Sequence, residues 1–70
     1  MMVIFTFPNT HNAIRAERAV KKAGIKLRMT PVPRHISTDC NVGLNVSEHD
    51  KSRCVQILEH AGIPHRCVSP

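Results

Sequence analysis

A short segment of this chain occurs twice, and this repeat constrains the fold more than any other feature of the sequence. Residues 23–29 align with residues 61–67 at a spacing of 38, and four of the seven positions are identical. In each copy a run with helical periodicity ends at a glycine, Gly24 or Gly62, and a segment with strand periodicity follows. The repeat therefore predicts two β-α-β units.

The residues around the repeat complete this pattern. Alternating apolar residues predict strands over residues 3–7, 25–30 and 42–46 and a final strand after Gly62. Thr10 is predicted to cap a first helix, and a second helix is predicted to begin within residues 47–50. The inward positions expected on these helices are Ala13, Ala16, Val20, Ala23, Cys54, Ile57, Leu58 and Ala61. This order predicts an α+β, ferredoxin-like βαββαβ fold for a single domain of residues 1–70, with a four-stranded antiparallel sheet and two helices on one face.

The length and the cysteine usage exclude several classes of protein. A domain of 70 residues has no room for a deep catalytic cleft, so we expect a non-enzyme. No apolar run approaches the roughly 20 residues of a membrane span, and the N-terminus lacks the basic segment of a secretory signal. Three cysteines cannot all pair, and they lie too far apart in the sequence for the closely spaced ligand pairs of a structural zinc site. Free thiols indicate a cytoplasmic protein.

The net charge of +5 is unevenly distributed. Residues 1–34 hold seven of the ten basic groups and one acid, whereas residues 35–70 are near neutral. Arg15, Arg18 and Lys22 share the polar side of the first helix and form either a docking face for an acidic partner or a solvated surface.

Among the three cysteines, Cys40 is the one predicted to be exposed. It lies in the longest predicted loop, from Pro31 to Asn41, which is too polar to bury. Cys54 falls on the apolar stripe of the second helix, and Cys67 has the inward parity of the final strand, so both are predicted to pack as small hydrophobic residues. An incidental exposed thiol is the alternative interpretation of Cys40.

Reactivity at Cys40 requires the thiolate, and the same loop offers a cation. A cation such as Arg34 or His35 at about 6 Å would favour the thiolate by roughly 2–3 kcal/mol in an effective dielectric near 20. Asp39 is adjacent and acts in the opposite direction, so the sign of the net effect depends on which side chain faces the sulfur.

The most specific motif of the chain combines Pro31-Val32-Pro33-Arg34 with Ile36-Ser37 and Cys40. With this motif, and over nearly its whole length, the chain resembles a small bacterial family of selenium/sulfur carrier-like proteins, long classed as a domain of unknown function. This resemblance implies a cysteine that takes up sulfur or selenium as a persulfide or perselenide, and this role maps onto Cys40. Asn41 stands where family members usually have glycine, which adds bulk beside the sulfur.

The resemblance also implies partners. The Cys40 thiolate would receive the chalcogen from a donor such as a cysteine desulfurase and pass it to an acceptor enzyme, with no cofactor beyond this transient covalent group. Arg34 would stabilise the thiolate and the terminal anion, and Ser37 and Thr38 could donate hydrogen bonds. A homodimer is compatible with the predicted fold.

Three other functions compete with the carrier hypothesis. RNA binding would need exposed aromatic residues, but Phe5 and Phe7 share the inward parity of the first strand. A metal site could combine loop and strand residues, although no local ligand spacing supports it. Its ligands would be Cys40, Cys67, His35 and His65. A regulatory or protein-interaction module is the third alternative.

Overall fold

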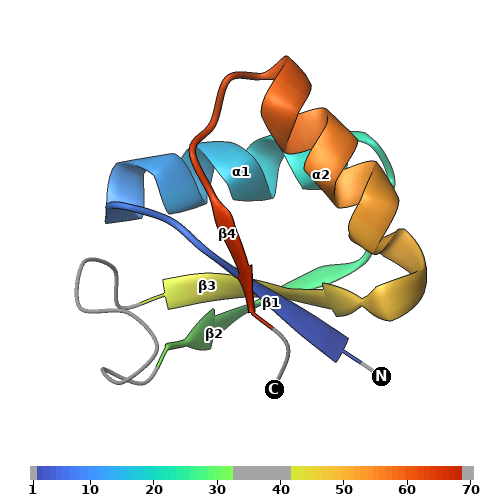
Figure 1. Cartoon of the computed structure of the whole chain (residues 1–70), viewed down its shortest axis with the longest axis horizontal. Coiled ribbons are helices and arrows are strands. Elements are labelled where there is room, and N and C mark those ends of the chain that lie inside the picture. Colours follow the sequence, from blue (N-terminus) through green and yellow to red (C-terminus); the bar gives the residue numbers. More distant parts are fainter. Residues whose placement is uncertain (1, 33–41, 69–70) are drawn as a thin grey trace.

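The computed structural model of the chain describes residues 2–32 and 42–68, which form strands and helices (Figure 1). The strands are β1 (Met2–Thr6), β2 (Leu27–Pro31), β3 (Val42–Ser47) and β4 (Arg66–Val68), and the helices are α1 (Thr10–Lys22), the short 3₁₀ helix η1 (Glu48–Asp50) and α2 (Lys51–His60). The predicted α+β class and βαββαβ order are confirmed. We call β1, α1 and β2 the first unit, and β3, α2 and β4 the second unit.

The four strands form one antiparallel sheet in the order β2-β3-β1-β4. Both helices cover the same face of this sheet (Figure 1). One row of side chains crosses all four strands, because Met29 pairs with Leu44, Leu44 with Phe5, and Phe5 with Cys67. Met29 and Cys67 occupy equivalent positions of the sequence repeat, and they therefore lie at opposite edges of the sheet.

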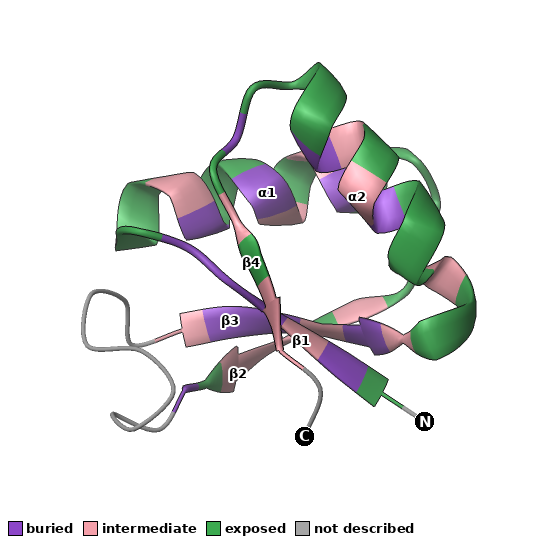
Figure 2. Cartoon of the chain, in the orientation of Figure 1, coloured by how far each residue is buried: buried purple, intermediate pink, exposed green. Residues whose placement is uncertain are grey.

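The core lies between the sheet and the two helices. Alternate strand residues are buried on the helix-facing side, where Phe5 is 0% exposed and Leu44 is 1% exposed. Each helix contributes a narrow stripe to this core (Figure 2). The buried helix residues are Ala13, Ala16 and Val20 in α1 and Cys54 and Leu58 in α2. Small alanine side chains let α1 lie close to the sheet.

The two helices end in the same hydrogen-bonded motif. In the first unit the Ile25 amide donates to the Val20 carbonyl at 3.4 Å, and the Gly24 amide donates to the Lys21 carbonyl at 3.0 Å. Gly24 has a φ of 83°, which is the left-handed conformation that closes a Schellman motif. We call this turn from helix to strand a corner. Val20 and Ile25 are both buried, so the corner also has the apolar contact typical of a Schellman motif.

The second unit repeats that corner at the equivalent positions of the sequence repeat. The Ile63 amide donates to the Leu58 carbonyl at 2.9 Å, and the Gly62 amide donates to the Glu59 carbonyl at 3.1 Å. Gly62 has a φ of 69°. The prediction that Gly24 and Gly62 end the helices is thus confirmed.

Two arginines join the units reciprocally. Arg15 of α1 donates through Nη2 to the carbonyl of Ala61, the C-cap of α2, at 3.5 Å. Arg53 of α2 donates through Nη2 to the carbonyl of Ala23, the C-cap of α1, at 3.4 Å. The two arginines, like the two alanines, are 38 residues apart, which is the spacing of the repeat, and so occupy equivalent places in the two units. Each helix therefore places a cation at the negative end of the other.

Several predicted positions are corrected by the structure. Asn9, and not Thr10, caps α1, since its side chain accepts from the Asn12 amide at 2.9 Å. Ala23 and Ala61 are exposed because each is already the C-cap, where the chain leaves the buried stripe.

The ends of the predicted strands and of the second helix are shifted as well. β1 ends at Thr6, although Phe7 beyond it is buried as predicted. β2 runs on through Pro31, which pairs with Val42. The predicted start of the second helix forms η1, which is capped by Ser47 through a bond from the His49 amide at 3.3 Å.

Candidate functional site

The residues predicted to carry chemistry lie outside the described part of the chain. Cys40, Arg34, Ser37 and Thr38 all fall within residues 33–41, as do His35, Asp39 and Asn41. What the structure describes is the frame that carries this segment, which the chain enters after Val32 and leaves before Val42.

This frame is a pair of neighbouring strands at one end of the sheet. Pro31, the last residue of β2, pairs with Val42, the first residue of β3, so the chain leaves and rejoins the sheet at adjacent positions. Thr6 and Arg66 pair at the end of β1 where the chain turns toward α1. The segment with Cys40 is therefore attached to the end of the sheet where β1 finishes and β4 begins.

Val32 fixes the entry to this segment. Its exposed fraction is 7%, although it follows the last residue of β2. A Cβ atom added to Gly43 would meet Val32 Cγ2 at 2.8 Å and Ile4 Cγ2 at 2.9 Å, so these two side chains close over Gly43. Ile4 is next to buried Phe5 in β1, so its side chain points to the sheet face that the helices leave open. Val32 contacts the same side of Gly43 as Ile4 and therefore lies on this open face.

Gly43 permits this packing because it has no side chain. An added Cβ would also lie 2.7 Å from the Phe5 carbonyl oxygen, and backbone cannot move aside as a flexible side chain can. The anchor made by Val32, Ile4 and Gly43 was missed by the sequence analysis. A glycine inside an otherwise regular strand was its only local signal.

A buried acceptor lies on the same open face. Asn45 pairs with Ile4 on one side and with Arg28 on the other. Its Oδ1 atom is covered and has no hydrogen-bond partner in the part of the chain that is described.

Cys54 is a core residue, as predicted. It is 1% exposed and lies on the buried stripe of α2. Burial is the main cause that raises the pKa of its thiol; Asp50 and Cys67 raise it further, and Arg53 acts in the opposite direction. A thiol held in its neutral form is a poor nucleophile, so Cys54 is unsuited to accept a chalcogen.

Cys67 is half-buried and packs against the core from β4. His65 precedes it by two residues, and the His65 ring meets Phe5 edge-on with centroids 5.9 Å apart. The Nδ1 atom of His65 lies 2.9 Å from the Ile63 carbonyl oxygen, which can only accept, so Nδ1 carries a hydrogen. These contacts show that His65 is packed against the core beside β4.

The other predicted sites receive no support from the described residues. Residues 2–32 and 42–68 contain no group of three His, Cys, Asp or Glu side chains arranged to hold a metal ion. Of the ligands considered for such a site, Cys40 and His35 lie outside these ranges. Phe5 and Phe7 are 0% and 3% exposed and cannot stack on bases. Neither described helix is long and apolar enough to cross a membrane.

A family model described as "Putative Se/S carrier protein-like" matches residues 2–69, which is nearly the whole chain. Neither the curated proteins nor the solved structures contain a significant match. The resemblance identified from the sequence motifs is thus confirmed over both units and over the segment that joins them.

Proposed function

Because the chain belongs to the Se/S carrier protein-like family, we propose that it carries sulfur or selenium on Cys40 and delivers it to a partner enzyme. The family match over residues 2–69 is the observation that carries this proposal. A carrier of this kind needs an accessible thiol, two partner proteins and no cleft of its own.

The described cysteines support the choice of Cys40 by their own placement. Cys54 is buried with a raised pKa, and Cys67 packs against the core. Transfer at Cys54 would require the core to open, because the attacking sulfur must reach a sulfur held by another protein, and at Cys67 the half-buried side chain restricts this approach. Cys40 is the remaining cysteine of the chain.

The proposed transfer is a thiol exchange. The Cys40 thiolate attacks the outer sulfur of a donor persulfide, a new bond joins the two sulfur atoms, and the donor cysteine leaves as its thiolate. Cys40 then holds the sulfane sulfur until a nucleophile of the acceptor attacks it in the same way. Arg34 stabilises the attacking thiolate and the terminal anion, and Ser37 and Thr38 donate hydrogen bonds to it. The domain performs no turnover itself, and we place it in the reducing cytoplasm.

The anchor at Val32 and Gly43 has a clear use in such a carrier. A chalcogen bound to a loop must be presented in a reproducible position, and both strands that flank this segment are fixed by pairing of Pro31 with Val42. Val32 also holds the entry strand against the open face of the sheet.

Mass spectrometry tests the proposal directly. The protein is incubated with a cysteine desulfurase and cysteine, or with selenide under oxidising conditions, and then digested without reductant. We expect the mass of one added sulfur or selenium on the peptide with Cys40, loss of this mass in Cys40→Ser, and its retention in Cys54→Ala and Cys67→Ala. Label on the Cys54 or Cys67 peptides alone would disprove the assignment.

A further inference from the structure

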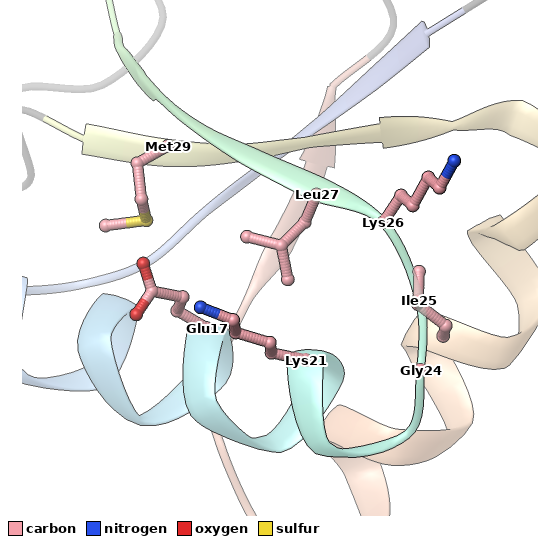
Figure 3. Close-up of a pocket in the computed structure, with 7 residues that line it drawn as sticks. All are labelled: Glu17, Lys21, Gly24, Ile25, Lys26, Leu27 and Met29. Atoms are coloured by element: carbon pink, nitrogen blue, oxygen red, sulfur yellow. The ribbon is translucent and has the colours of Figure 1, made fainter.

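A hollow of about 540 Å³ opens between α1 and β2 (Figure 3). Leu27 and Met29 point into it from the strand, and Glu17 and Lys21 point toward it from the helix. Gly24 and Ile25 close the hollow at the turn that joins helix and strand. Leu27 and Met29 are only half-buried, so the hollow leaves part of their apolar surface open to solvent.

The strand beside this hollow is an edge strand. β2 stands at one end of the order β2-β3-β1-β4, so within the described residues it pairs only with β3. An edge strand can accept an extended peptide as an additional strand. Alternate side chains of such a peptide would enter the hollow beside Leu27 and Met29, and the others would lie near Arg28 and Thr30 on the open face.

The charge around this edge selects the kind of peptide. Residues 10–31 contain six basic side chains and one acid, whereas residues 48–68 contain three of each. Within the lining of the hollow, Lys21 and Lys26 outnumber Glu17, and the exposed Arg28 lies on the adjacent face of β2. An acidic segment would therefore be attracted to this edge.

The second unit provides an internal comparison for this argument. It has the same helix corner, but Glu59 stands at the position of Lys21, and Pro64 stands at the position of Lys26. The β4 edge thus follows the same helix corner as the β2 edge but lacks its lysines. The basic rim belongs to the first unit specifically and is no consequence of the fold.

We propose that β2 is a docking edge for an extended acidic segment of a partner protein. The segment adds to the sheet beside β2, its apolar side chains fill the hollow, and its carboxylates face Lys26 and Arg28. Lys21 lines the hollow itself and adds to the positive charge near the segment. This inference goes beyond the carrier function, because it uses neither Cys40 nor a bound chalcogen. One added strand makes a small interface that depends on charge, so the complex is weak and salt-dependent.

A labelled peptide of alternating glutamate and valine, about seven residues long, is the probe. Its binding is measured by fluorescence anisotropy, and its position is mapped by ¹⁵N NMR on the full chain. The test variant is Lys21→Glu combined with Lys26→Glu. The control is Lys51→Glu combined with Arg66→Glu, which changes the net charge equally at exposed positions of the second unit. Two further peptides replace glutamate by lysine or valine by serine.

The proposal predicts amide shifts centred on residues 27–30 and about tenfold weaker binding to the Lys21/Lys26 variant. The control variant should bind within about twofold of the original chain, and both altered peptides should bind more weakly. The docking proposal would be overturned by absence of binding, by amide shifts centred on β4, or by equal losses of affinity in the two variants. If sedimentation shows a dimer and NMR shows that the β2 amides are protected in it, the edge is assigned to a second copy instead. The assay contains no sulfur or selenium donor, so its failure leaves the carrier proposal unaffected.

Discussion

The first and second units share their corners and differ in the side chains that the common backbone carries. Both helices end in a Schellman motif whose apolar pair is buried, Val20 with Ile25 in one unit and Leu58 with Ile63 in the other. Between these fixed points the side chains diverge. Cys54 stands at the position that Ala16 occupies in the first unit. The corner residues therefore set the backbone, and the positions between them can change.

This comparison clarifies the roles of the described cysteines. Cys54 replaces a buried alanine, and Cys67 replaces Met29, at the other end of the same row across the sheet. The first unit fills both positions with apolar side chains, which is what a packing role requires. The excess of basic residues in the first unit has no such packing explanation, because these side chains lie on the surface.

The largest expected effect comes from removing the apolar half of one corner. Leu58→Ala should lower the free energy of unfolding by about 2–5 kcal/mol, because Leu58 is fully buried and its loss leaves a cavity. Val20→Ala removes one carbon fewer and should cost about 0.8 kcal/mol less. Urea unfolding followed by circular dichroism measures both. A greater loss for Val20→Ala would contradict the equivalence of the two corners.

Gly43 tests the anchor that it forms with Val32 and Ile4 between the two units. Gly43→Ala should destabilise the protein by about 1–3 kcal/mol, since the new Cβ would lie 2.7 Å from the Phe5 carbonyl oxygen and 2.8 Å from Val32 Cγ2. Adding Val32→Ala removes the second collision only, so it should restore part of the lost stability. If Gly43→Ala alone is neutral in thermal unfolding, the side chains do not close over Gly43 as described.

The two corner glycines should respond equally. Gly24→Ala and Gly62→Ala each place a side chain at a positive φ, of 83° and 69°, with no atom within 4 Å of the added Cβ. The loss is thus one of backbone conformation and should be about 1–2 kcal/mol in each case. Asn tolerates this conformation better, so Gly24→Asn and Gly62→Asn should lose less. Clearly unequal losses in chemical denaturation would show that the corners are not equivalent.

The reciprocal arginines should have a smaller and salt-dependent effect. Arg15→Gln and Arg53→Gln each remove a cation from the C-terminal end of the opposite helix, with an expected loss of about 0.3–1 kcal/mol. Arg18→Gln on the exposed side of α1 is the matched control and should be nearly neutral. Denaturation at low and high salt separates the cases, because the losses at Arg15 and Arg53 should shrink as ionic strength rises. A loss that does not change with salt would speak against a charge effect.

The fold was predictable from local patterns, because apolar alternation and the two helix-ending glycines are properties of neighbouring residues. The N-cap was assigned wrongly because Asn9 and Thr10 are both good capping residues, and only the backbone decides between them. The Arg15 and Arg53 contacts, in contrast, join residues far apart in the sequence. Their equivalent places in the repeat were a readable signal, yet it gains meaning only once two helices are known to lie side by side.

The candidate site was less accessible to such reasoning. Its chemistry was assigned by resemblance to a family, and Cys40, Arg34, Ser37 and Thr38 stay predictions because they lie outside the described residues. The anchor formed by Val32 and Gly43 depends on packing across three strands, which periodicity along one strand does not encode.

The smallest expected effect concerns the thiol that distinguishes α2 from α1. Burial raises the pKa of Cys54, so the folded protein keeps this proton at a pH where the unfolded chain releases it. Stability from this source is therefore complete below the ordinary thiol pKa of about 8.5 and is lost as the pH rises above it. Cys54→Ala gives the second unit the alanine of the first and should remove this contribution.

The difference in unfolding free energy between the original chain and Cys54→Ala measures it, because the other titrating groups are common to both. This difference should be smaller at about pH 9.5 than at about pH 7, where neither state ionises the thiol. A difference for Cys54→Ala that is constant across this range would mean that the Cys54 thiol is no more protected from water in the folded protein than in the unfolded chain.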